Sequence, residues 1–191
     1  MTPLPIHAVF AEALEVLESS RLPFAIMGGF AIRALGLPRP TYDGDLVVEA
    51  DVEQSLDLFR RFDEAGFRVP EEFSKGFRDH LHGMEKVAIH KLEERHDWRI
   101  DLFFPTTPLL KSAFARRKQL KFMGKERAVL TAEDIVLLKL LAGRTKDKLD
   151  IEELLKIHRS LDIAYLTLWA GRLDLAAELR EQLRAAGLAG A

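Results

Sequence analysis

Two aspartates separated by one residue, Asp43 and Asp45, are the side chains in this sequence best placed to do chemistry. They open an apolar run, Leu46 to Val48, that predicts a β-strand, and residues two apart on a strand face the same side. Carboxylates held this close raise one another's pKa unless a cation lies between them. Mg²⁺ binds carboxylate oxygens and keeps coordination sites for substrate phosphates. The pair therefore predicts a cation site.

The residues before this pair predict a phosphate-binding turn. Phe24 to Met27 is a short apolar run typical of a buried strand, and Gly28-Gly29 follows it directly. Glycine lets the backbone approach another group closely, and helical spacing continues as far as Leu35. Main-chain amides at the start of a helix bind phosphate. The turn and the carboxylates together predict a site for a metal ion and a nucleoside triphosphate.

The elements that must position these residues indicate an α/β fold with a mixed sheet flanked by helices. Up to residue 130 the pattern predicts helices and strands in mixed order, with helices at 6–19, 51–65 and 109–115, strands at 24–27, 43–48, 84–90 and 98–104, and a hairpin at 116–130. From Thr131 it predicts four helices, at 132–142, 146–158, 162–170 and 173–186. We therefore expect a domain at 1–130 and a helical module at 131–191 packed on it. The buried face of the 51–65 helix is expected to hold Val52, Leu56, Phe59 and Phe62.

The motif Gly28-Gly29, helix, Arg39-x-Thr41-x-Asp43-x-Asp45 resembles the opening motif of the DNA polymerase β-type nucleotidyltransferase superfamily. It is most similar to the variant found in bacterial abortive-infection (Abi-type) toxin nucleotidyltransferases. The resemblance implies that the glycines cradle phosphates, that Arg39 and Thr41 belong to the nucleotide site, and that the two aspartates hold two Mg²⁺ ions.

The same resemblance assigns a third metal-binding carboxylate to Asp101. This residue lies within the apolar run Trp98 to Phe104, where a bare buried carboxylate is costly. The family usually has a bulky aliphatic residue between its first two aspartates, whereas this chain has Gly44. On an ordinary strand, Gly44→Val is expected to stabilise the protein by about 1 kcal/mol.

A second group of residues, from Leu138 to Asp150, resembles later motifs of the same toxins. Lys139 lies in an otherwise apolar helix, where a cation needs a partner, and a triphosphate would supply one. The resemblance places Arg144 beside it, to counter phosphate charge. Asp147 and Asp150 are expected either to orient these cations or to act on the acceptor hydroxyl.

The resemblance implies transfer of a nucleoside monophosphate from a triphosphate to an acceptor hydroxyl, with RNA or tRNA as acceptor and a cognate antitoxin as partner. Two alternatives stay open: a small-molecule (antibiotic) nucleotidyltransferase, and a catalytically silent nucleotide-binding or regulatory module. A basic cluster could grip RNA, although a solvated face is the favoured interpretation; its members are Lys111, Arg116, Arg117, Lys118, Lys121, Lys125 and Arg127.

Composition adds few constraints. The 28 Lys and Arg residues nearly balance the 30 Asp and Glu residues, so no overall attraction to nucleic acid is implied. The chain has no cysteine, which excludes disulfides and thiolate metal sites. No signal peptide is expected, and no uninterrupted apolar run approaches membrane-spanning length. A cytoplasmic protein without a membrane partner is expected.

Overall fold

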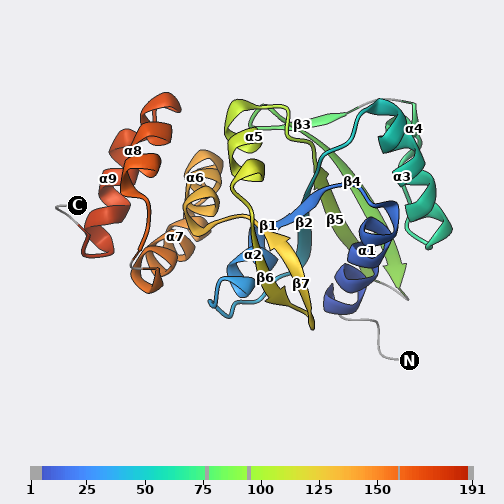
Figure 1. Cartoon of the computed structure of the whole chain (residues 1–191), viewed down its shortest axis with the longest axis horizontal. Helices are drawn as coiled ribbons and strands as arrows, with labels where there is room; N and C mark the ends of the chain where they lie inside the picture. The colour runs from blue at the N-terminus through green and yellow to red at the C-terminus, as the bar shows by residue number, and fades with distance from the viewer. Residues whose placement is uncertain (1–5, 76–77, 94–95, 159, 189–191) are drawn as a thin grey trace.

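The computed structural model describes residues 6–75, 78–93, 96–158 and 160–188. These residues form an α/β fold built on a seven-stranded mixed sheet flanked by helices (Figure 1). The expected fold class is therefore confirmed.

The helices and strands follow the predicted order closely. The first half contains α1 (Ile6–Ser20), β1 (Phe24–Met27), α2 (Gly28–Ala34), β2 (Asp43–Val48), α3 (Val52–Glu64), α4 (Glu71–Ser74), β3 (Asp79–Leu81) and β4 (Met84–Glu93). The second half contains β5 (His96–Phe103), α5 (Pro108–Ala115), β6 (Lys118–Phe122), β7 (Lys125–Val129), α6 (Ala132–Ala142), α7 (Thr145–Ile157), α8 (Ile163–Arg172) and α9 (Ala176–Ala185).

The sheet has the strand order β3-β4-β5-β2-β1-β7-β6. Strand β2 lies at its centre, antiparallel to β1 and parallel to β5. In this register Asp45 lies opposite Asp101, and Gly44 lies opposite Ile100. The pairing of β2 with β5 therefore places Asp45 beside Asp101, although 55 residues of chain lie between them.

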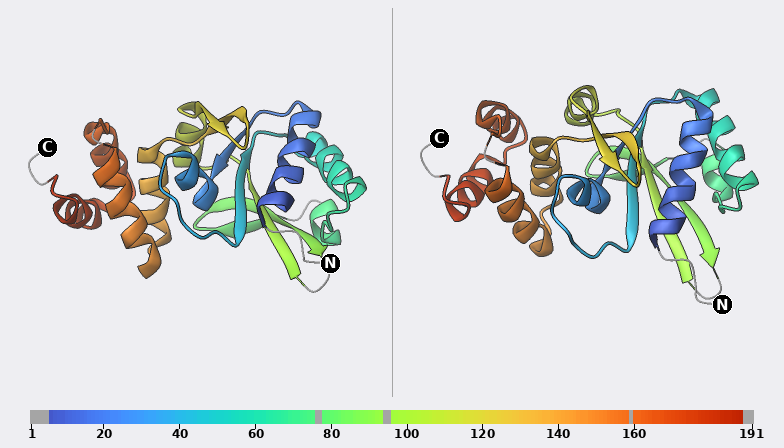
Figure 2. Two further views of the ribbon diagram at one scale, coloured as in Figure 1. Left: turned by 90° about the horizontal axis from the view of Figure 1, so that it is seen from below. Right: turned by 60° about the horizontal axis from the view of Figure 1, so that its bottom comes forward.

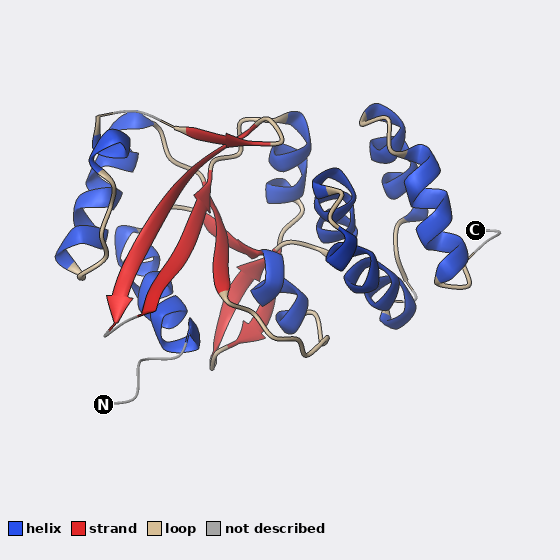
Figure 3. Cartoon of the chain, turned by 180° about the vertical axis from the view of Figure 1, so that it is seen from behind, coloured by secondary structure: helices blue, strands red, loops and turns tan. Residues whose placement is uncertain are grey.

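Helices lie at both ends of the molecule. Figure 2 shows α1 and α3 at one end and the helices α6 to α9 at the other, and Figure 3 shows the same arrangement from behind. Helix α6 begins directly after β7, with the Thr131 hydroxyl accepting a hydrogen bond from the Asp134 amide as its N-cap. Helix α6 also contacts α2. The division into modules at residue 131 stays a prediction.

The predicted buried face of α3 is partly wrong. Phe59 and Phe62 are buried, but Val52 and Leu56 are 67% and 40% exposed, and Leu58 is buried in their place. The helix starts after Asp51, whose side chain forms a reciprocal capping box with Gln54. Val52 in the first turn and Leu56 in the second lie on the side of α3 that faces solvent.

The expectation for Gly44 is also wrong, because no space is left for a side chain there. A Cβ atom at this position would lie 2.5 Å from a ring carbon of Phe10 and 2.6 Å from the Ile100 methyl group. Phe10 is itself fixed, since its ring stacks on Phe30 with the centroids 3.9 Å apart. The aromatic ring of α1 occupies the volume that a bulky aliphatic residue would fill.

Gly44→Ala is therefore expected to destabilise the protein by about 2 kcal/mol, the usual cost of overpacking a core. The matched control is Gly171→Ala in α8, where an added Cβ meets nothing within 4 Å. That change should be neutral or stabilising, because alanine favours helix. Urea unfolding of both variants measures the difference. A more stable Gly44→Ala variant would restore the sequence-based expectation.

In the part of the chain that the structure describes, we find no helix both long and apolar enough to cross a membrane.

Candidate active site

A cavity of about 250 Å³ opens at the junction of the central strands with α2, α6 and α7. It is lined by all the predicted site residues except Thr41 and Asp150, namely Gly28, Gly29, Arg39, Asp43, Asp45, Asp101, Lys139, Arg144 and Asp147. Further lining comes from Met84, Arg99, Leu138 and Lys146, among others. The structure thus brings the two groups of predicted residues, from residues 28–45 and 139–147, into one pocket.

The two glycines are required by the side chains that pack against them. Gly28 has a φ of 61°, in the left-handed region, and a Cβ there would overlap the Asp45 carboxylate. A Cβ on Gly29 would overlap the Thr41 hydroxyl. Thr41 is buried, and its hydroxyl has no hydrogen-bond partner among the described residues. Its place beside Gly29, behind the cavity lining, indicates that Thr41 shapes the turn.

The carboxylates carry the electrostatic strain that the sequence predicts. Burial is the largest cause that raises the pKa of Asp45 to about 7, and the nearby charges of Asp43 and Asp101 act in the same direction. A cation placed among the three groups would relieve this cost.

Asp101 has partners that the sequence analysis missed. The guanidinium of Arg99 donates two hydrogen bonds to it, with Nε and Nη2 each 2.8 Å from a carboxylate oxygen. Lys86, which is buried, donates a third from Nζ at 3.3 Å. The strand period could have revealed Arg99, since it lies two residues before Asp101 and therefore on the same face of β5.

The residues present fit a hard divalent cation. Three carboxylates on adjacent strands supply oxygen donors of the kind that Mg²⁺ prefers, and the raised pKa of Asp45 reflects its burial first and their mutual repulsion second. As the side chains lie, no group of three or more His, Asp and Glu residues in the described ranges converges into a ready-made metal cluster. Asp101 instead faces Arg99, so metal binding would require this carboxylate to exchange its partner.

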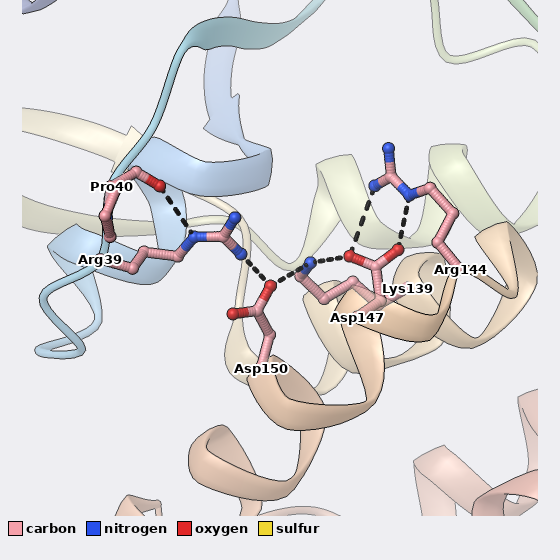
Figure 4. A network of polar contacts seen from close by, with 6 residues as sticks. All are labelled: Arg39, Pro40, Lys139, Arg144, Asp147 and Asp150. Atoms are coloured by element: carbon pink, nitrogen blue, oxygen red, sulfur yellow. Dashed lines mark hydrogen bonds and ion pairs between the residues drawn. The ribbon is translucent and has the colours of Figure 1, made fainter.

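A charged network fills the α6–α7 side of the cavity (Figure 4). The ammonium of Lys139 donates hydrogen bonds to Asp147 and, at 2.7 Å, to Asp150. Arg144 contacts Asp147 at 2.6 Å, and Arg39 pairs with Asp150 from the loop before β2. Lys139 therefore has the partner that a buried cation needs within its own chain, in the two carboxylates that the sequence analysis names as groups that could orient it.

The pKa values of this network reflect the same contacts. Burial lowers the pKa of Lys139, and the hydrogen bond to Asp147 opposes that shift. Burial by itself would raise the pKa of Asp147. The hydrogen bonds of this carboxylate to Arg144 and Lys139 outweigh that effect and hold its pKa below the usual value. By contacts, the network sets three basic side chains, Arg39, Lys139 and Arg144, against two carboxylates.

The basic cluster of residues 111–127 is solvated in part, since Lys111, Lys118, Lys121 and Lys125 are exposed. Arg127 is only 5% exposed and pairs with Glu18, as does Lys125. The Arg116 guanidinium lies 3.8 Å over the ring centroid of Tyr165. None of the seven residues is among the described residues that line the active-site cavity. This arrangement gives no support to an RNA-binding role for the cluster.

The raised pKa of Asp45 has a measurable consequence for stability. Because the folded state binds the proton more tightly than the unfolded chain, metal-free protein should become more stable as the pH falls through about 7. Between pH 8 and pH 6 this group should contribute about 1.4 kcal/mol, one pKa unit's worth. The Asp45→Asn variant should not show this gain in the free energy of unfolding between pH 8 and pH 6. Urea unfolding with a chelator at both pH values measures it, and parallel pH curves for the two proteins would place the pKa of Asp45 elsewhere.

Solved structures with the nucleotidyltransferase fold resemble this chain over most of its length. ANT(2'')-Ia in complex with adenylyl-2''-tobramycin aligns with a TM-score of 0.59 and 18% identity, covering 87% of this chain and 95% of that chain. An antigenic nucleotidyltransferase-like protein from Paracoccidioides brasiliensis aligns with a TM-score of 0.56 and 20% identity, covering 96% and 95%. The lincosamide antibiotic adenylyltransferase LnuA, bound to lincomycin, aligns with a TM-score of 0.53 and 13% identity, covering 82% and 100%.

No protein-family profile matches the chain, and no curated protein sequence matches it. The structural neighbours establish that the chain has the nucleotidyltransferase fold. At these identities they establish the fold and leave the reaction to be tested, because one fold supports many functions.

Proposed function

We propose that this protein is a Mg²⁺-dependent nucleotidyltransferase that moves a nucleoside monophosphate from a triphosphate to an acceptor hydroxyl. The observation that carries the proposal is the convergence of Asp43, Asp45 and Asp101 in one cavity with the Gly28-Gly29 turn. The cations Arg39, Lys139, Arg144 and Lys146 line the same cavity and match the charge of a triphosphate.

In the proposed reaction the acceptor oxygen forms a bond to the α-phosphorus of the triphosphate. The bond between that phosphorus and the pyrophosphate oxygen breaks, and pyrophosphate leaves. The hydroxyl proton passes to a carboxylate of the cavity, for which we propose Asp101, and from there to water. Mg²⁺ ions held by Asp43, Asp45 and Asp101 would neutralise phosphate charge, while the chain's own cations hold the triphosphate in line.

Two versions of this proposal differ in the identity of the acceptor. The resemblance to toxins favours RNA or tRNA, with an antitoxin as partner. Two structural neighbours instead act on or bind antibiotics, as their adenylyl-tobramycin and lincomycin ligands indicate. These neighbours motivate a test with small-molecule acceptors beside tRNA.

The test has two stages. First, the melting temperature is measured with Mg²⁺ and each of the four nucleoside triphosphates; a ligand that binds the folded state raises it. A silent module without a nucleotide site would show no shift with any of them. Second, α-³²P-labelled triphosphate is incubated with protein and either total tRNA or a panel of hydroxylated small molecules. Label on tRNA alone supports the toxin-like version, and label on small molecules alone supports the other.

A further inference from the structure

A second cavity, of about 300 Å³, lies between α5, α6 and α8. Its volume is at the lower end of the range for small-molecule pockets. Apolar side chains dominate its lining: Pro108 and Leu109 at the start of α5, Leu141 of α6, and Trp169 and Leu173 at the end of α8.

This apolar cavity adjoins the active-site cavity. His82, in the turn between β3 and β4, lines both of them. Helix α6 also runs beside both, because Leu138 and Ala142 line the active-site cavity and Leu141 lines the apolar one. Leu138 and Leu141 are three residues apart and therefore neighbours on the helix surface. A molecule that occupies the apolar cavity would lie next to the site of transfer.

The two cavities differ sharply in charge. The active-site cavity contains carboxylates and several cations, whereas the described lining of the apolar cavity contains no carboxylate. Its guanidinium, from Arg172, lies 5.0 Å over the ring centroid of Trp169. In the described lining a polycation would meet this positive charge, His82, Thr107 and apolar carbon, and no carboxylate. An apolar group that is uncharged or anionic fits the lining better.

We propose that the apolar cavity binds the acceptor, and that the acceptor is a small hydroxyl-bearing molecule with an apolar ring system, uncharged or anionic. This inference rests on the proposed nucleotidyl transfer and names its acceptor class. It excludes polycationic aminoglycosides and RNA as the acceptor. The apolar part fills the cavity beside Leu141 and Trp169, and the hydroxyl extends past His82 toward the carboxylates.

The binding test uses 8-anilinonaphthalene-1-sulfonate, an anionic apolar dye that fluoresces when bound, with the full chain. Leu141→Gln, in the cavity, should weaken dye binding at least about tenfold, since it places a polar amide in an apolar site. The matched control is Leu168→Gln in α8, whose side chain is 52% exposed and outside the cavity lining; it should bind as the unaltered protein does. Leu173→Gln is a second cavity variant should Leu141→Gln fail to fold. Equal dye affinity in a folded cavity variant and the control overturns the proposal.

Displacement of the dye then tests the acceptor class. 2-(1-Naphthyl)ethanol, a neutral alcohol, should displace it, whereas tobramycin and total tRNA should not. Displacement by tobramycin or tRNA but not by the alcohol overturns the proposal.

The outcome is separable from that of the proposed function. A melting-temperature shift with Mg²⁺ and a triphosphate tests the active-site cavity alone. A normal shift with no cavity-dependent dye binding removes this inference and leaves nucleotidyl transfer standing. Loss of any triphosphate effect removes nucleotidyl transfer, and the acceptor assignment with it, whatever the dye shows.

Discussion

Replacing Asp43 with Asn is expected to lower nucleotide transfer about a thousandfold while the fold stays intact. Asp43 lies at the exposed start of β2 and lines the active-site cavity. The change removes one negative charge from the carboxylate group without changing the size of the side chain. A bound metal contributes several kcal/mol to transition-state stabilisation, and a thousandfold loss corresponds to about 4 kcal/mol. Transfer of label from α-³²P-triphosphate measures the effect.

The control for this variant is Asp63→Asn, which removes an exposed carboxylate from α3, outside the cavity. It changes the net charge equally and should transfer at the normal rate. A second readout is independent of turnover: since Asp43 is one cause of the raised pKa of Asp45, that pKa should fall in the Asp43→Asn protein. Full activity in Asp43→Asn would exclude this residue from the mechanism.

The sequence predicts that Asp43 and Asp45 lie together beside the glycine turn, because the signals for this arrangement are local. Asp43 and Asp45 share a strand face by spacing alone, and the glycines before them mark the turn. The pairing of β2 with β5, which sets Asp45 opposite Asp101, was accessible only through the resemblance to a known superfamily. Periodicity predicts that both strands exist but not that they are neighbours.

Contacts between distant segments account for the errors. Gly44 is read from sequence as a weak point of a strand, but Phe10, 34 residues earlier, packs against it. The ion pair between Arg39 and Asp150 joins residues 111 positions apart. Sequence periodicity cannot place such partners, because each depends on how whole elements pack. Arg99 is different, since the two-residue spacing to Asp101 was available and was overlooked.

The largest stability loss is expected from replacing Lys139 with Met, which removes the charge and keeps most of the volume. The ammonium lies between Asp147 and Asp150, and all three residues are buried. Breaking a buried ion pair from one side leaves carboxylates without their partner and typically costs about 3–5 kcal/mol. Arg144 and Arg39 still contact these carboxylates, so we expect a loss of about 3 kcal/mol in urea unfolding.

Two further variants separate the structural role of Lys139 from a role in binding triphosphate. Adding Asp147→Asn and Asp150→Asn to Lys139→Met should recover part of the lost stability, because the two buried carboxylate charges are removed. Arg39 and Arg144 lose these partners, but their side chains are 24% and 55% exposed. Lys146→Ala removes an exposed cation that lines the same cavity, and it should weaken triphosphate binding without changing the free energy of unfolding. A Lys139→Met protein of normal stability but weak triphosphate affinity would instead show that the two carboxylates position this lysine for phosphate and contribute little to the fold.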